Sequence, residues 1–157
     1  MSADETCQSA EGGHGAAIER AVRALARRDQ SAADVRAKLA RAGISEAVQT
    51  DAVETLERIG YVDDGRFARE RAARLAERAY GDDWIRADLD AHGIDAETAN
   101  AAVDTLQPEA ERAERAVSNA AGGGRAAARL ARKGFSEGTI ERFLTGGVAP
   151  EPPEGVG

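Results

Sequence analysis

The sequence predicts an all-α protein made of repeated helical units, and three observations support this fold class. Ala, Arg, Glu and Leu, which are strong helix formers, dominate the 157 residues. No run of alternating β-branched residues is long enough to indicate a strand. A seven-residue phrase occurs three times, as LARAGIS at 39–45, LDAHGID at 89–95 and LARKGFS at 130–136.

This phrase has the pattern of a tight corner between two helices. Its glycine stands just past a helix end, where the left-handed backbone conformation is favourable without a Cβ atom. The apolar residue after the glycine can fold back onto the leucine four positions before it. The final Ser or Asp can accept from the first free N–H groups of the next helix. The sequence therefore predicts three equivalent corners, at Gly43, Gly93 and Gly134, with caps at Ser45, Asp95 and Ser136.

Three helices are expected around the first corner. Apolar residues between 18 and 25 share one face of the first helix. Ser31 caps the second helix, and Asp34 stands at the position of a capping box. An apolar face between 48 and 59 marks the third helix.

The same pattern continues in two further units. A helix from about 64 to 79 starts the second unit, and helices that hold 84–89 and 99–106 follow it. Pro108 begins the third unit, which again contains three short apolar faces. We therefore predict a disordered acidic tail at 1–14, helical repeats at 15–60, 61–107 and 108–144, and a disordered C-terminal tail at 145–157.

The joint between the first two repeats, GYVDDGRFARE at 60–70, contains two adjacent acids that could form a catalytic pair. Helix punctuation accounts for them better. Gly60 can end one helix, Asp63 can cap the next, and Asp64 then meets the positive end of the helix dipole. Adjacent carboxylates at a helix start point in different directions, and no third polar group nearby completes a site. The sequence predicts no catalytic residue and no enzyme.

The net charge of −7 is unevenly distributed along the chain. Residues 15–80 carry thirteen basic and eleven acidic side chains, residues 81–111 carry one and nine, and residues 112–144 carry seven and three. An acidic middle argues against a protein that coats bare nucleic acid along its whole surface, because that binding depends on phosphate neutralisation. The pattern is compatible with a protein partner that has charged patches of its own.

Other features indicate a soluble cytoplasmic protein without a cofactor. The single cysteine, Cys7, excludes an internal disulfide, and the polar N-terminus does not resemble a secretory signal. No apolar run is long enough to span a membrane. His14 and His92 have no further ligands at metal-binding spacing. The three glycines at 122–124 lack the ending of a phosphate-binding loop, so no metal or cofactor site is expected.

Two basic clusters are candidates for contact with an acidic protein surface or a phosphate backbone. The first shares one helix face at spacings of three and four residues, and the second precedes the third corner. The alternative is a solvated face, with Glu70 and Arg74 as an ordinary exposed ion pair. The two clusters consist of Arg71, Arg74 and Arg78, and of Arg125, Arg129, Arg132 and Lys133.

The joint and the second corner together resemble the signature of the RecX family of recombination regulators. GYVDDGRFA is followed by a glycine and then by WIRADLDAHGID, while SAADVRAKLARAGIS and RAAARLARKGFSEGTI resemble the first and last repeats of that family. The resemblance covers about residues 16–144. The matching positions are Gly60, Tyr61, Val62, Asp63, Asp64, Phe67, Ala68, Gly81, Ile85, Leu89, Gly93 and Ile94.

The chain departs from the family pattern at a few places. Leu75 lies between Arg74 and Arg78, where the family usually has an arginine late in the helix. Ala126 stands where the other two repeats have Val35 and Ile85. The middle repeat is also unusually acidic.

The resemblance implies a function and a shape. RecX proteins are non-enzymatic, bind the RecA recombinase chiefly as its filament on single-stranded DNA, and restrain its ATPase and strand-exchange activities. It also implies an elongated, curved array of three tandem three-helix repeats. We therefore expect a monomer that binds RecA filaments in recombination and DNA repair, without a cofactor or a membrane, and leave open a weak direct contact with DNA. Two alternatives remain, namely a helix-turn-helix DNA-binding module and a helical adaptor for another protein.

Overall fold

The computed structural model describes residues 3–120 and 122–145, with side chains from residue 13 onward. This part of the chain contains nine α-helices and no strand, which confirms the all-α fold class. The helices are α1 (Ala3–Leu25), α2 (Ala32–Arg41), α3 (Glu46–Arg58), α4 (Asp64–Glu77), α5 (Asp82–Ala91), α6 (Ala96–Asp104), α7 (Glu109–Val117), α8 (Gly123–Arg132) and α9 (Glu137–Leu144).

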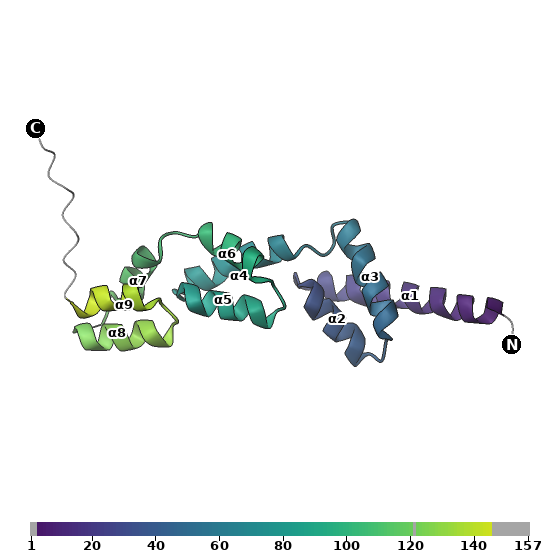
Figure 1. Ribbon diagram of the computed structural model, residues 1–157, viewed down its shortest axis with the longest axis horizontal. Helices are drawn as coiled ribbons and strands as arrows, with labels where there is room; N and C mark the ends of the chain where they lie inside the picture. Colours follow the sequence, from purple (N-terminus) through teal and green to yellow (C-terminus); the bar gives the residue numbers. More distant parts are fainter. Residues whose placement is uncertain (1–2, 121, 146–157) are drawn as a thin grey trace, which may run out of the picture.

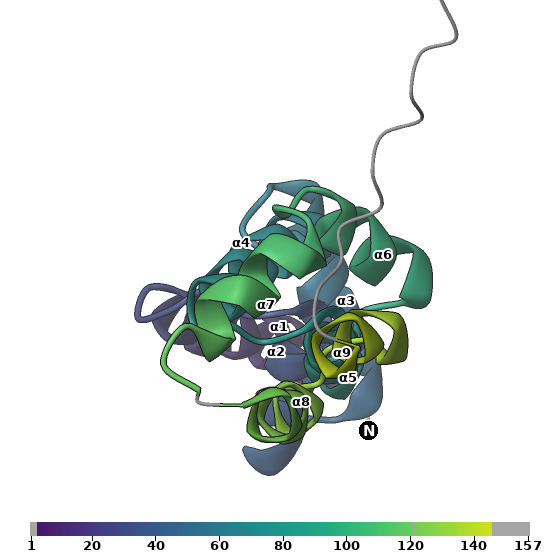
Figure 2. The same cartoon turned by 90° about the vertical axis from the view of Figure 1, so that its left-hand side faces the viewer.

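The helices form three groups of three that lie in a row along an elongated molecule (Figure 1). Seen along the long axis, the groups stand one behind another (Figure 2). Each group has a hydrophobic core of its own, with Leu39 and Leu56 fully buried in the first, Ile85 and Leu89 in the second and Leu130 in the third. Tandem three-helix repeats are therefore confirmed.

Helix α1 begins at Ala3, so the predicted disordered tail is wrong for residues 3–14. The glycines at 12, 13 and 15 lower the helix propensity of this stretch without ending the helix. A polar contact with α3 helps to hold this part of α1, since Nδ1 of His14 lies 2.8 Å from Oδ2 of Asp51. The predicted C-terminal tail lies outside the described residues from 146 onward, and Thr145 ends α9.

The three predicted corners are present. Gly43, Gly93 and Gly134 adopt φ values of +78°, +73° and +69°. The N–H of the next residue donates back to the carbonyl of the preceding leucine at 3.1 Å in all three, which is the bond of a Schellman ending. Asp95 caps its helix, whereas Ser45 and Ser136 make no capping hydrogen bond. Ser136 instead donates its hydroxyl proton to Glu109, whose charge makes it the stronger acceptor.

Neighbouring repeats join through the same elements at both junctions. At each junction, the start of the second helix of one repeat contacts the corner of the next repeat. The hydroxyl of Ser31 donates to the carbonyl of His92 at 2.6 Å. The N–H of Gly81 donates to the carbonyl of Lys133 at 2.8 Å. His92 and Lys133 both directly precede a corner glycine, so the array extends by repeating one contact.

An acid in the first turn of the following repeat completes each junction. Oδ1 of Asp64 accepts from the N–H of Ala32 at 2.8 Å, and Oε1 of Glu109 accepts from the N–H of Asp82 at 2.9 Å. Ala32 and Asp82 are the first residues of α2 and α5, whose opening N–H groups have no partner within their own helix. Asp64 thus joins two repeats as well as starting α4.

A buried arginine links the second and third repeats. Arg112 of α7 is 1% exposed. Its guanidinium donates to the carbonyls of Gln107 (3.1 Å) and Tyr80 (2.7 Å) and forms an ion pair with Asp82. Burial of a charge is costly unless it is paired and hydrogen-bonded, and here every nitrogen of the guanidinium has an acceptor.

Candidate partner-binding surface

The two adjacent acids of the joint are used for structure. Oδ1 of Asp63 accepts from the N–H of Arg66 at 2.9 Å, as the capping prediction requires, and Asp64 is committed to Ala32. Within the described residues, no group of three His, Cys, Asp or Glu side chains is placed to hold a metal ion. Over the same residues, no helix combines the length and the apolar character needed to cross a bilayer.

The residues that matched the RecX signature are mostly structural. Phe67, Ile85, Leu89 and Ile94 are buried in the core of the second repeat. Gly60 and Gly93 take left-handed conformations, and Gly81 is buried at the second junction. Tyr61 differs from the others because it is 52% exposed.

Of the first basic cluster, Arg71 is held by a structural ion pair. Its guanidinium donates to both carboxylate oxygens of Asp88, at 2.7 and 2.8 Å, and so ties α4 to α5. This hydrogen bonding holds the pKa of Asp88 below its ordinary value. Arg74 is exposed and lies 3.7 Å from Glu70, the ordinary surface pair that the sequence allowed. Arg74 therefore keeps an exposed side chain, whereas the guanidinium of Arg71 is already engaged by Asp88.

We expect Asp88→Asn to lower the free energy of unfolding by about 1 kcal/mol at neutral pH, because solvent screens this half-buried pair. The pKa of Asp88 is lowered in the folded state, so its contribution is present above the unfolded pKa near 3.9 and is lost as the pH falls through the folded value. Urea unfolding from pH 7 to pH 3 measures the difference. Asp90→Asn, an exposed neighbour in α5, is the control, and an equal loss in both variants would contradict the role of the pair.

The structure brings members of the two basic clusters together at the second junction. Nζ of Lys133 donates to the carbonyl of Arg78 at 2.7 Å and lies 4.7 Å from the ring centroid of Tyr80. The guanidinium carbon of Arg78 is 5.8 Å from the same centroid. Burial lowers the pKa of Lys133, and the charges of Arg129 and Arg78 add to this effect. The rest of the second cluster, Arg125, Arg129 and Arg132, is exposed on α8.

An aromatic pair that the sequence did not single out borders this cationic junction. Tyr80 and Trp84 stack with their ring centroids 5.2 Å apart and an interplanar angle of 20°. Trp84 is 44% exposed, although the sequence placed it on a helix with an apolar face. Tyr80 and Trp84 are four residues apart across the start of α5, and this spacing was the sequence signal for the pair. Whether the two rings stack depends on the turn that precedes α5, which the spacing does not specify.

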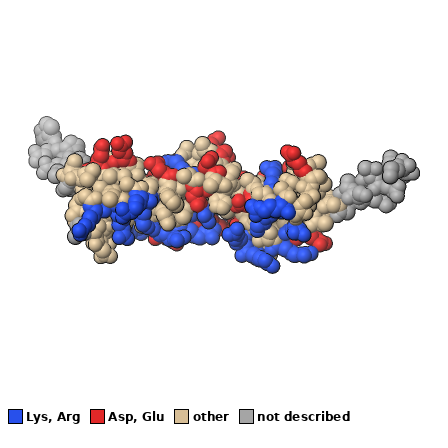
Figure 3. Space-filling view, turned by 90° about the horizontal axis from the view of Figure 1, so that it is seen from below, with Lys and Arg blue, Asp and Glu red and all other residues tan. Residues whose placement is uncertain are grey.

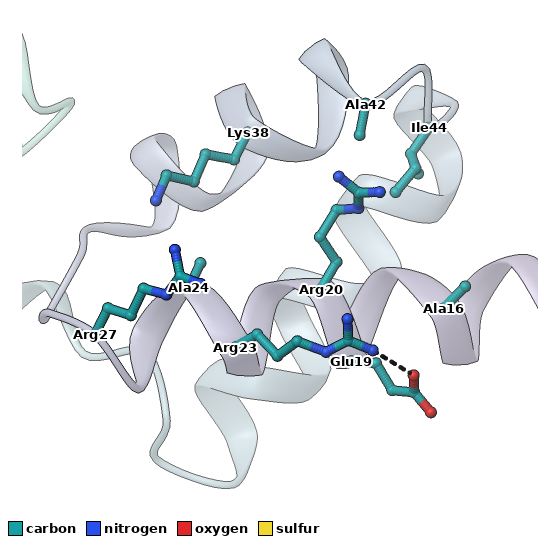
Figure 4. A pocket seen from close by; sticks show the side chains of 9 residues that line it. All are labelled: Ala16, Glu19, Arg20, Arg23, Ala24, Arg27, Lys38, Ala42 and Ile44. Atoms are coloured by element: carbon teal, nitrogen blue, oxygen red, sulfur yellow. Dashed lines mark hydrogen bonds and ion pairs between the residues drawn. The ribbon is translucent and has the colours of Figure 1, made fainter.

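A basic groove in the first repeat was also missed. It lies between α1 and α2, has a volume of about 580 Å³, and is lined by three arginines of α1 and the turn after it and by one lysine of α2 (Figure 4). The spacing of three and four residues in α1 matches that of the first cluster and could have revealed half of it. We call this hollow the α1–α2 groove, and its cations are Arg20, Arg23, Arg27 and Lys38.

A second hollow is bordered mainly by the first repeat, and the ion pair of Asp29 and Arg66 is part of its lining. It has a volume of about 530 Å³ and is bordered by Val22 and Leu25 of α1 and by Ile59 and Tyr61 after α3. Ile59 and Tyr61 are 57% and 52% exposed, so two large side chains present apolar surface to solvent beside this hollow. Helix punctuation does not account for Tyr61, and its place here beside a hollow suits contact with a protein.

Basic side chains gather on one long side of the folded molecule. Figure 3 shows Lys and Arg along its lower edge over all three repeats, while most Asp and Glu lie toward the upper edge. The charges that are separated by repeat along the chain are thus also separated by side in the fold. This basic side also reaches across the acidic middle repeat (Figure 3).

The comparisons with known proteins point to one family. Residues 17–56 match the family model described as RecX, first three-helix domain, and residues 63–103 match RecX, second three-helix domain. The regulatory protein RecX of Stenotrophomonas maltophilia (strain R551-3) is 32% identical over 135 residues, which cover 80% of this chain and 83% of the relative. The regulatory protein RecX of Xanthomonas oryzae pv. oryzae (strain MAFF 311018) is 38% identical over 90 residues, covering 57% and 56%.

Solved structures show the same fold. The crystal structure of RecX from Lactobacillus salivarius aligns with a TM-score of 0.75 over 86% of this chain and 96% of that one, at 19% identity. A crystal structure of a regulatory protein RecX aligns with a TM-score of 0.77 over 92% and 80%, also at 19% identity. At such identity the likeness is one of fold, and it extends over most of this chain in both cases.

Proposed function

We propose that this chain, which belongs to the RecX family, binds the RecA recombinase and its filament on single-stranded DNA and restrains RecA ATPase and strand exchange. The relatives are named regulatory proteins, which supports a non-enzymatic role. The proposal includes a monomer that acts in the cytoplasm, where it would meet RecA during recombination and DNA repair.

One observation of the structure supports this proposal most strongly, namely the basic side that runs over all three repeats of an elongated array (Figure 3). A helical filament offers the same protein surface again and again. An elongated array can follow such a surface with many modest contacts, each contributed by a separate repeat. Positive charge along that side would speed association with an acidic filament and fix its orientation.

The exposed arginines of α4 and α8 are the proposed contacts in the second and third repeats. Arg74, Arg129 and Arg132 are exposed and have no buried partner. Arg71 is excluded because it holds Asp88, and Lys133 because it packs on Tyr80. Reversing the charge of the three exposed arginines should therefore weaken binding without disturbing a core or a junction.

We expect the triple variant Arg74→Glu/Arg129→Glu/Arg132→Glu to bind preformed RecA filaments about tenfold more weakly, because it removes favourable charge from the docking side. Filament binding is measured on immobilised single-stranded DNA coated with RecA. The matched control reverses three exposed arginines of α3, α7 and α9, as Arg58→Glu/Arg115→Glu/Arg142→Glu. An unchanged affinity of the first variant, with circular dichroism intact, would mean that this side is not the contact.

A further inference from the structure

We infer that the α1–α2 groove is a binding site for the sugar–phosphate backbone of single-stranded nucleic acid. Arg20, Arg27 and Lys38 would hold the phosphates, with Arg23 at the margin. This site goes beyond the proposed function, because it acts in the first repeat alone and needs no recombinase.

Cations from two helices share one hollow. Arg20 and Arg27 extend from α1 and Lys38 extends from α2 into the space between the helices (Figure 4). From Arg20 to Arg27 the helix rises about 10 Å, which is longer than the spacing between neighbouring phosphates of a strand. The groove can therefore contact more than one phosphate at the same time.

The positive charge of the groove is largely unneutralised. Glu19 is the single acid of its lining, and it pairs at 3.3 Å with Arg23, both side chains being highly exposed. Among the residues whose side chains are described, no acid forms an ion pair with Arg20, Arg27 or Lys38. Like charges held close together repel one another, and a polyanion in the groove would relieve that repulsion.

The rest of the lining suits a polymer backbone. Ala16, Ala24 and Ala42 have short side chains, so a ligand can approach the helices closely. The volume of about 580 Å³ lies in the range of sites that enclose a small ligand. No aromatic ring lines the groove, so it offers no platform on which a base could stack. Binding therefore depends mainly on phosphate contacts and is strongly dependent on salt.

The concave shape favours a single strand over a duplex. Helix-turn-helix modules read duplex DNA with a helix that projects into the major groove. Here the cations face inward, across a hollow between two helices, so a rigid duplex would meet the rims and miss the floor. The same shape accepts one flexible strand laid along α1.

The test uses the full chain, without RecA, and a fluorescently labelled oligo(dT) of fifteen nucleotides. Anisotropy titrations between 50 and 200 mM salt give the affinity and its salt dependence. We expect Arg20→Gln/Lys38→Gln to weaken binding about tenfold at the lowest salt. The slope of log K against log salt should fall in magnitude by about 1.4, since each phosphate contact to a single strand contributes about 0.7.

The matched control, Arg58→Gln/Arg142→Gln, removes the same charge from exposed positions of α3 and α9 and should retain the affinity within about threefold. Equal losses in the two double variants would overturn the site in favour of diffuse surface charge. Absence of oligo(dT) binding at 50 mM salt would also overturn it. Tighter binding of a fifteen-base-pair duplex would overturn the site in favour of the helix-turn-helix alternative. Tighter binding of a polyglutamate peptide would overturn it in favour of a groove that contacts protein. None of these outcomes depends on RecA, so they leave the proposed function to its own test.

Discussion

Arg112→Met is expected to lower the free energy of unfolding by about 3 to 5 kcal/mol, the usual loss when one partner of a buried ion pair is removed. The variant keeps an apolar stem but leaves Asp82 without its cation and the carbonyls of Tyr80 and Gln107 without their donor. These acceptors lie at the junction of the second and third repeats. The third repeat should therefore lose its attachment before the first two repeats unfold.

Urea unfolding monitored by circular dichroism measures the loss, and hydrogen exchange shows where it falls. Arg115→Met is the control, because Arg115 is exposed and lies one turn later in the same helix. The control should change the free energy of unfolding by less than about 0.5 kcal/mol. Similar values for the two variants would show that the buried guanidinium is not what holds the third repeat in place.

Gly81→Ala should have the second largest effect, a loss of about 3 kcal/mol from overpacking at the same junction. Gly81 has φ −80°, a value that alanine adopts freely, so its backbone conformation is not the problem. A Cβ atom there would lie 2.3 Å from the carbonyl oxygen of Gly134 and 2.3 Å from main-chain atoms of Phe135. Main-chain atoms of a packed corner cannot move aside as the end of a side chain can.

Gly138→Ala is the control for this variant. A Cβ atom at Gly138 would meet nothing within 4 Å, and alanine is the better helix former inside α9. The control should therefore be neutral or stabilising. Hydrogen exchange should show α8 and α9 opening more often in Gly81→Ala and not in Gly138→Ala. Retained protection of both helices in Gly81→Ala would contradict this close contact between repeats.

Local features of the fold could be predicted from the sequence because they depend on neighbouring residues. The corner at Gly43 illustrates this, since the glycine, the leucine before it and the apolar residue after it are all within one phrase. The contacts between repeats could not be predicted in this way. Arg112 and Asp82 are 30 residues apart, in helices of different repeats, and meet only when the second and third repeats pack together. The position of Asp64 in the first turn of its helix already explains an acid there, so the sequence does not indicate that Asp64 also accepts from the N–H of Ala32.

The basic surface was predictable in part for the same reason. The spacing of Arg71, Arg74 and Arg78 predicts one basic face of α4, but it cannot show that the guanidinium of Arg71 is paired with Asp88 of α5. Along the sequence, acidic side chains are concentrated in the middle repeat. In the fold, basic and acidic side chains lie toward opposite edges of the molecule (Figure 3). The α1–α2 groove needs Lys38 to face α1 across a hollow, and this depends on how two helices pack.

Regulation of RecA is tested most directly by the ATPase activity of the cognate RecA on single-stranded DNA, measured with and without the wild-type protein. The Arg74→Glu/Arg129→Glu/Arg132→Glu variant serves as the matched comparison. We predict that the wild-type chain lowers the ATPase rate at concentrations below those at which it binds bare DNA, and that the variant needs about ten times more protein. A RecA rate that stays unchanged up to concentrations at which bare DNA is saturated would contradict the proposed function.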